Sequence, residues 1–103
     1  MSSPRKRRYS IEELRDIVAP IAEKYGVSRV YLFGSVARGD DDEKSDYDFY
    51  IEMDKVMDLF TLSGFFLDLH QAIGSDIDLL DNKSIDKEFL KVIQSEGVIV
   101  YEG

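Results

Sequence analysis

Residues 29–53 read RVYLFGSVARGDDDEKSDYDFYIEM, two β-rich segments on either side of a polar, acidic loop. Residues 29–33 are rich in β-forming side chains and stop abruptly at Gly34-Ser35, so they predict a short strand followed by a tight turn. Residues 46–53 predict a second strand. Three of its large side chains share one face, because side chains alternate along a strand: Tyr47, Phe49 and Ile51. The stretch therefore predicts strand, turn, loop and strand in that order.

A helical pattern precedes this stretch. Ser10 and Glu13 form a capping box, and apolar residues then recur at helical spacing over 11–25. Gly26 suits the position just after the end of a helix. Pro20 lies inside the pattern, where its missing N–H predicts a kink or an interruption.

Helix and strand patterns alternate after the stretch. They predict a helix over 56–73, a strand over 76–80, a helix that starts at the N-cap Ser84 and ends before Gly97, and a strand over 98–101. Gly64 weakens the first of these helices in its middle. The order α-β-turn-β-α-β-α-β predicts an α/β (α+β) fold, a small mixed β-sheet covered by helices.

The composition limits the size of the core and the kinds of partner. The chain has 103 residues, so we expect one domain at residues 10–103, preceded by a flexible basic arm at residues 1–9. It has no cysteine, which excludes disulfides, zinc–thiolate sites and cysteine nucleophiles. Neither a secretory signal nor a membrane-spanning run is present, so we expect a cytoplasmic protein with no membrane contact.

The charge is unevenly distributed. A net charge of −8 disfavours binding to long nucleic acids, because the surface repels their phosphates. The exception is the basic block Arg5-Lys6-Arg7-Arg8. Two interpretations of the block stay open, a solvated arm or an arm that touches nucleic acid or an acidic partner.

Gly34-Ser35 is the first candidate for chemistry. A glycine after an apolar strand permits a tight turn, and a serine at the start of a helical turn offers a hydroxyl and free N–H groups to a phosphate. Gly-Ser pairs are also common as ordinary turns. The pair by itself therefore leaves both interpretations open.

Three aspartates are the second candidate. Asp46 and Asp48 lie two residues apart on a strand, so both carboxylates point to one face, and a hard cation such as Mg²⁺ or Mn²⁺ would relieve their repulsion. Asp78 interrupts an apolar strand, which is costly for a buried carboxylate unless it is paired or binds metal. We expect Asp78 to be buried, more so than Asp76 on the same face. The alternative is that these carboxylates are solvated at strand ends.

These elements combine into one pattern, Gly-Ser-x₁₀-Asp-x-Asp. With GSVARGD at 34–40, SDYDFYIE at 45–52 and SDIDLLD at 75–81, the sequence resembles the minimal nucleotidyltransferase (MNT) family of the polymerase-beta-like nucleotidyltransferase superfamily. The resemblance covers residues 10 to 102. Members of this family are commonly paired with a helical HEPN toxin, for which they are the antitoxin.

The resemblance implies a role for each residue. Gly34 and Ser35 would hold the β- and γ-phosphates of the substrate ATP, and Asp46 and Asp48 would coordinate two Mg²⁺ ions. Asp78 would complete the metal site and help to activate the attacking hydroxyl. The reaction implied is transfer of AMP to a tyrosine of the HEPN toxin. Arg38 either neutralises a phosphate or faces solvent.

Other functions are also compatible with the sequence. The chain could be a non-catalytic antitoxin that neutralises its partner by binding, or a small-molecule nucleotidyltransferase, for which it looks too short. The lone histidine, His70, is expected to be a helix surface residue without a catalytic role. The aromatic and aliphatic residues of the 56–73 helix are expected to be mostly core, with part of them forming a partner or homo-oligomer surface: Phe60, Leu62, Phe65, Phe66 and Leu67.

Overall fold

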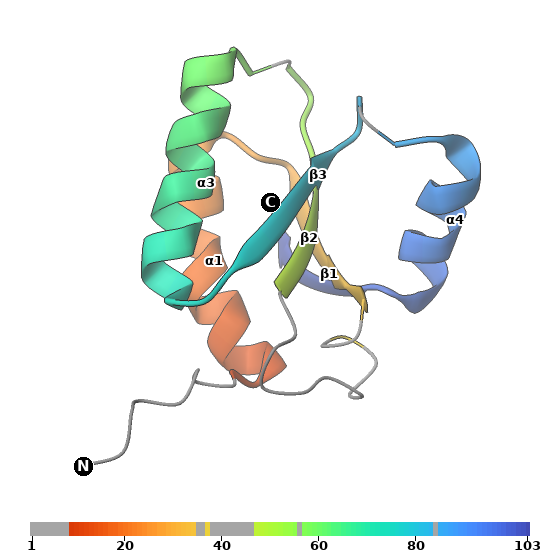
Figure 1. The fold of residues 1–103 in the computed structure, drawn as a ribbon, viewed down its shortest axis with the longest axis horizontal. Helices are drawn as coiled ribbons and strands as arrows, with labels where there is room; N and C mark the ends of the chain where they lie inside the picture. Colours follow the sequence, from red (N-terminus) through yellow and green to blue (C-terminus); the bar gives the residue numbers. More distant parts are fainter. Residues whose placement is uncertain (1–8, 35–36, 38–46, 56, 84) are drawn as a thin grey trace.

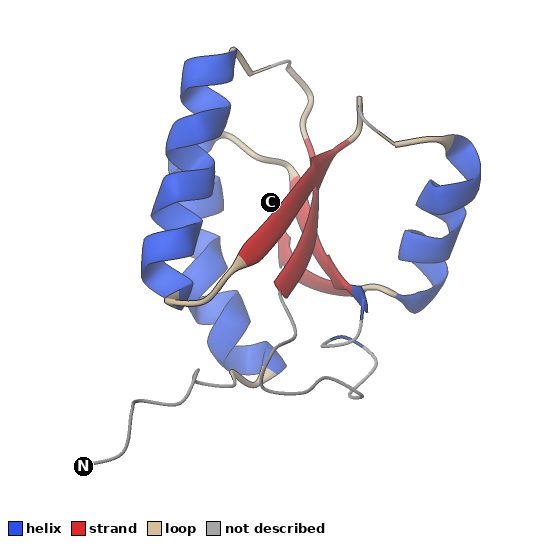
Figure 2. Cartoon of the chain, in the orientation of Figure 1, coloured by secondary structure: helices blue, strands red, loops and turns tan. Residues whose placement is uncertain are grey.

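A computed structural model describes residues 9–34, 37, 47–55, 57–83 and 85–103. Seven elements follow one another along the chain (Figures 1 and 2): α1 (Ile11–Tyr25), β1 (Arg29–Phe33), β2 (Tyr47–Glu52), α3 (Leu59–Ile73), β3 (Ile77–Asp81), α4 (Lys87–Glu96) and β4 (Val98–Glu102). Their order is the predicted one. None of the described helices is both long and apolar enough to cross a membrane.

The four strands form one mixed sheet in the order β3-β2-β1-β4. β1 runs antiparallel to both β2 and β4, whereas β2 and β3 are parallel. The parallel pair follows from the connection, because α3 carries the chain back across the sheet between the two strands. Helices α1 and α3 cover one face of the sheet and α4 covers the other (Figure 1). The predicted mixed sheet covered by helices is confirmed.

Alternation along the strands divides the apolar residues between the two faces. The larger core lies under α1 and α3 and includes the residues predicted to share one face of β2, namely Tyr47, Phe49 and Ile51. Tyr50, which points the other way, packs with Tyr31 and with Ile93 of α4. The sheet is therefore buried on both faces, but the cluster under α4 is smaller.

The helix ends agree with the sequence in α1 and differ in the two later helices. Ser10 and Glu13 form the expected capping box, and Gly26 adopts φ 72° after the last turn. α1 is not interrupted at Pro20, which is exposed, so water can serve the carbonyl that loses its backbone donor.

The starts of α3 and α4 correct the prediction. α3 begins at Leu59, because the Asp58 side chain accepts the Thr61 N–H at 2.7 Å and caps the helix there. α4 begins at Lys87, because Asp86 accepts the Phe89 N–H at 2.8 Å. Ser84, the predicted N-cap of α4, lies outside the described residues, and the cap is Asp86.

Tyr9 connects the N-terminal segment to the domain. Its N–H donates to the Tyr47 hydroxyl at 3.0 Å, and its own hydroxyl donates to the Ile73 carbonyl at 2.8 Å. Tyr9 is the last residue of the predicted arm, and the rest of that arm, including Arg5 to Arg8, lies outside the described residues. The domain contacts therefore extend to at least residue 9.

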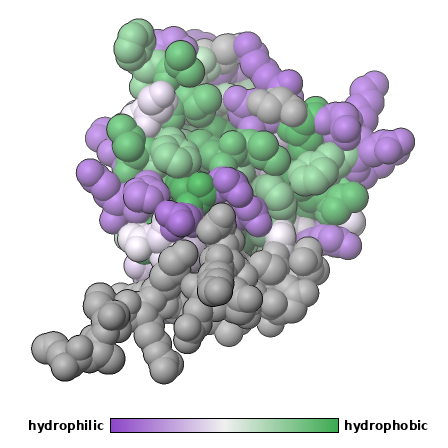
Figure 3. All heavy atoms as spheres, in the orientation of Figure 1, coloured by the Kyte–Doolittle hydropathy of each residue, from purple (hydrophilic) through white to green (hydrophobic). Residues whose placement is uncertain are grey.

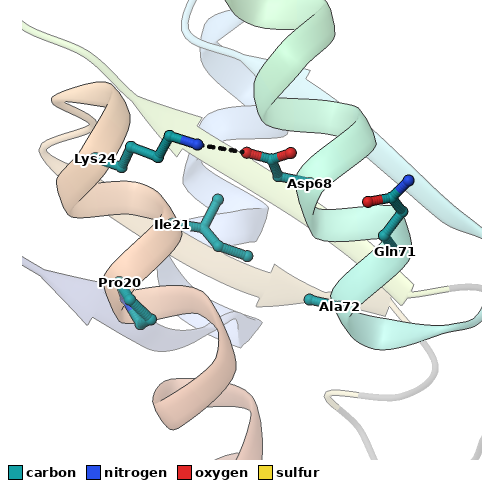
Figure 4. A pocket seen from close by; sticks show the side chains of 6 residues that line it. All are labelled: Pro20, Ile21, Lys24, Asp68, Gln71 and Ala72. Atoms are coloured by element: carbon teal, nitrogen blue, oxygen red, sulfur yellow. Dashed lines mark hydrogen bonds and ion pairs between the residues drawn. The ribbon is translucent and has the colours of Figure 1, made fainter.

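Polar contacts join α1 to α3 at the face away from the sheet. The Tyr25 hydroxyl donates to Asp68 Oδ2 at 2.8 Å, and Lys24 Nζ lies 3.4 Å from the same oxygen, as Figure 4 shows for Lys24. The hydrogen bond from Tyr25 lowers the pKa of Asp68 and raises that of Tyr25. An added Cβ at Gly64 would lie 3.0 Å from the Tyr25 hydroxyl oxygen. Gly64 therefore leaves room for this contact between helices.

We expect Tyr25→Phe to lower the melting temperature at pH 7 and to have less effect near pH 3. The pKa of Asp68 is depressed in the folded protein, so its stabilising contribution is present above the unfolded pKa and is lost as the pH falls through the folded pKa. Thermal unfolding of both proteins across this pH range measures the effect. An equal loss of melting temperature at both pH values would contradict the role given to the Asp68 carboxylate.

Candidate active site

Asp48 and Asp78 lie side by side in the sheet. They are register partners in the parallel pair of β2 and β3, so their side chains project from the same face. Phe33, the last residue of β1, is the register partner of Asp48 on its other side. The two carboxylates, 30 positions apart in the chain, are therefore neighbours at the point where β1 ends and the Gly34 turn begins.

Gly34 lies against the Asp48 carboxylate. Its φ is 80°, in the left-handed region that L side chains rarely adopt. A Cβ added there would overlap Oδ2 of Asp48 and lie 3.2 Å from its Cγ. The residue after β1 must therefore be glycine for two separate reasons, its backbone conformation and its distance from the carboxylate.

The burial predicted for Asp78 is wrong. Its side chain is exposed, as is that of Asp76. β3 is at the edge of the sheet, so only β2 flanks it among the described strands, and α4 packs mainly against β1. The chain neighbours of Asp78, Ile77 and Leu79, belong to the opposite face of β3 and to the larger core.

The predicted site is described in part. Gly34, Asp48 and Asp78 meet at one place, whereas Ser35, Arg38 and Asp46 lie outside the described residues. Within the described part of the chain, His, Asp and Glu side chains form no group of three able to hold a metal. Asp46 precedes Asp48 by two residues, so its place on the same face stays a prediction.

The donors that are present suit a hard cation. Two carboxylates on one face supply only oxygen ligands, which Mg²⁺ prefers. The missing Cβ of Gly34 lets the Asp48 carboxylate lie directly against the backbone at the end of β1. Asp48 and Asp78 are therefore the described residues that would hold Mg²⁺.

Aromatic residues lie on the face of the sheet that carries Asp48 and Asp78. Phe33 meets Phe89 of α4 edge to face, with 5.7 Å between ring centroids. Next along the strands, burial and the neighbouring Glu52, Tyr31 and Asp81 raise the pKa of Tyr50 to about 12, so its hydroxyl stays protonated at neutral pH. Neither Phe33 nor Phe89 was predicted to lie at the site, although the position of Phe33 directly before Gly34 could have indicated it.

Arg29 and His70 lie away from the two aspartates of the candidate site. Arg29, at the far end of β1, forms ion pairs with Glu52 at 3.1 Å and Glu102 at 2.9 Å. His70 is on α3, on the opposite face of the sheet, with its ring stacked on Phe66 and Nε2 3.8 Å from Asp76. The position of His70 agrees with a surface role.

Comparison with known proteins assigns the chain to a family. Residues 16–103 match the family described as Polymerase beta, Nucleotidyltransferase. A Methanocaldococcus jannaschii protein with the provisional name protein adenylyltransferase MJ0435 is 33% identical, over 88% of this chain and 98% of its own length. The chain therefore belongs to the polymerase-beta nucleotidyltransferase family, and it is an enzyme of the nucleotidyltransferase class.

Solved structures refine this assignment to a smaller group. A structure described as a minimal nucleotidyltransferase superposes with a TM-score of 0.76 at 26% identity, covering 87% of this chain and 95% of that one. The MNT antitoxin group is also represented by the complex of a tri-AMPylated Shewanella oneidensis HEPN toxin with its MNT antitoxin, which matches with a TM-score of 0.69 at 18% identity, over 91% and 74% of the two chains. The fold is shared with both, and the predicted resemblance to minimal nucleotidyltransferases is confirmed.

Proposed function

We propose that this chain is a Mg²⁺-dependent protein adenylyltransferase that transfers AMP from ATP to a tyrosine hydroxyl of a HEPN-type toxin and so acts as its antitoxin. The observation that carries the proposal is the register pairing of Asp48 with Asp78 beside the glycine turn. The pair supplies two of the carboxylates that metal-assisted nucleotidyl transfer requires, and Gly34 lets one of them lie against the end of β1. The site would be completed by Ser35, Arg38 and Asp46.

The reaction gives each described residue a task. The acceptor hydroxyl oxygen attacks the α-phosphorus of ATP, the bond from that phosphorus to the bridging oxygen breaks, and pyrophosphate leaves. Asp78, whose side chain is exposed, orients the hydroxyl and accepts its proton. Asp48 would act on the polyphosphate by holding Mg²⁺, and Gly34 lets this carboxylate lie against the end of β1. Two Mg²⁺ ions bound by the aspartates would neutralise the charge that develops on the phosphates.

The nature of the acceptor is supported by the relatives. The M. jannaschii relative is named as a protein adenylyltransferase, and the Shewanella complex contains a HEPN toxin that carries three AMP groups beside an MNT antitoxin. These two names favour a protein as the acceptor.

Transfer of label from ATP tests this function. The purified chain is incubated with ATP labelled at the α-phosphate, Mg²⁺ and the HEPN-type protein of the same genome. We expect label on the HEPN-type protein, none when EDTA removes the metal, and none from ATP labelled at the γ-phosphate. Label that follows the γ-phosphate would indicate a kinase instead, and the absence of any label would contradict the proposal.

Neutralisation by binding alone is the second candidate. It is favoured by the large apolar side chains that α3 leaves in solvent, Phe60 at 90% and Leu67 at 55% exposure. Such side chains are typical of interaction surfaces when they gather together. A chain with Asp48→Asn that still silences the toxin, without labelling it, would show that binding suffices.

A further inference from the structure

An apolar groove runs between α3 and the outer edge of β3. It encloses about 630 Å³, and its lining comes from both elements: Leu62, Ser63, Phe66, Leu67, Ile77, Asp78 and Leu79. The side chains over these two elements gather into a hydrophobic area on the face shown in Figure 3. One of the lining residues is Asp78, whose side chain projects from the other face of β3 beside Asp48, so the groove and the site lie on the two sides of the same edge strand.

The backbone beside the groove is able to pair with another chain. β3 pairs with β2 only, which makes it one of the two edges of the sheet formed by the described strands. An edge strand presents N–H and C=O groups along its outer side, and an extended peptide can add to it as a further strand. The outer side of β3 is thus a template that borders both the groove and Asp78.

The charge beside this edge selects the kind of segment. Carboxylates lie along and just before β3, and they are Asp76, Asp78 and Asp81, within a chain of net charge −8. Such an edge repels a second copy of the same acidic strand and attracts a basic one. An apolar groove beside acidic side chains therefore fits a segment with an apolar anchor flanked by lysine or arginine.

We propose that the acceptor protein binds here through an extended, basic segment that adds to the edge of β3 and carries the modified hydroxyl. The proposal rests on the proposed function and adds the place and manner of acceptor binding. Side chains alternate along an extended segment. In the bound segment, one side chain fills the groove on the α3 side. The acceptor tyrosine, whose hydroxyl meets Asp78 on the other face of β3, is therefore the residue directly before or after it. The acceptor tyrosine should have an apolar neighbour at position −1 or +1.

A matched pair of substitutions on α3 tests the groove. Leu67 lines it, whereas Leu59 is 76% exposed on the same helix and lies outside the lining, about 12 Å away along the helix axis. Leu67→Arg places a cation where the basic segment binds. We expect it to raise the KM for the HEPN-type protein at least about tenfold, which corresponds to about 1.4 kcal/mol. The kcat and the affinity for Mg²⁺-ATP should be unchanged.

Leu59→Arg adds the same charge to the same helix and should leave the KM for the acceptor within about twofold of the wild type, a difference below about 0.5 kcal/mol. Both side chains are exposed, so both variants should fold, and thermal unfolding checks this. A normal KM in Leu67→Arg, or an equal rise in both variants, would overturn the groove as the acceptor site.

Hydrogen exchange of the complex locates the segment independently of catalysis. We expect the amides of β3 to exchange more slowly when the HEPN-type protein is bound to the Asp48→Asn variant, whereas those of β4, the other sheet edge, should not change. AMP transfer by the wild type without protection of β3 overturns the docking and leaves the proposed function standing. Protection of β3 without AMP transfer by the wild type overturns the proposed function and leaves the docking site standing.

Discussion

Asp48→Asn and Asp78→Asn are each expected to reduce AMP transfer by on the order of 10³-fold, the largest effect of any substitution outside the core. An amide in place of a carboxylate removes a negative charge from the oxygen set that would hold Mg²⁺. The two residues are register partners and serve the same site, so the double variant should be little worse than either single one. Initial rates of the single and double variants with ATP labelled at the α-phosphate test both expectations.

The control for these variants is Asp54→Asn. Asp54 is an exposed aspartate in the loop after β2, outside the candidate site, and the change in charge is the same. It should retain the wild-type rate. Asp78→Asn should unfold at the wild-type temperature, because its side chain is exposed. A rate in Asp48→Asn or Asp78→Asn near that of Asp54→Asn would remove the carboxylate pair from the mechanism.

Gly34→Ala is expected to have the second largest effect. The methyl group would overlap the Asp48 carboxylate, and the residue would also be held at φ 80°, where an L side chain costs about 1–2 kcal/mol. The carboxylate or the turn must move, and a displacement of about 1 Å at a reacting centre can cost about 10²-fold in rate. We therefore expect weaker Mg²⁺-ATP binding together with slower transfer.

Gly26→Ala separates the two causes. Gly26 has φ 72°, so the backbone cost is similar, but an added Cβ there has no described atom within 4 Å. This variant should lose stability by about 1–2 kcal/mol and keep its kcat. If Gly34→Ala loses stability to the same extent but transfers AMP normally, then the closeness of Gly34 to Asp48 has no catalytic meaning.

Local sequence patterns predicted most of the helices and strands, because the interactions that start and end these elements involve residues close in sequence. The capping box at Ser10 and the glycine after α1 act within one turn of their own position, and both are seen where they were expected. The strand over 29–33 was placed to the residue. The start of α4 was misplaced because two side chains able to cap a helix, Ser84 and Asp86, lie two residues apart. Which of the two residues caps α4 depends on the path of the chain between β3 and α4.

The burial of individual side chains was less predictable. The pattern around Asp78 is that of an inner strand, and the residue is exposed because β3 lies at the sheet edge. The long α3 helix shows apolar residues on more than one face, of which Phe65 and Leu69 are fully buried and Phe60 and Leu67 are in solvent. The order of the strands decides the exposure of Asp78, and the orientation of α3 decides which of its apolar side chains are buried. Neither property can be read from a hydrophobic period of two or of 3.6 residues.

The sequence by itself determined the kinds of elements, their order, the family and the residue types of the site, since propensity, capping and motif spacing depend on neighbours along the chain. Only the tertiary structure decided that Asp48 pairs with Asp78, that Gly34 touches the carboxylate, and that an apolar groove opens between α3 and the edge of β3. Alternation assigns a side chain to one of two faces, but the register between distant strands comes from packing the whole sheet against its helices.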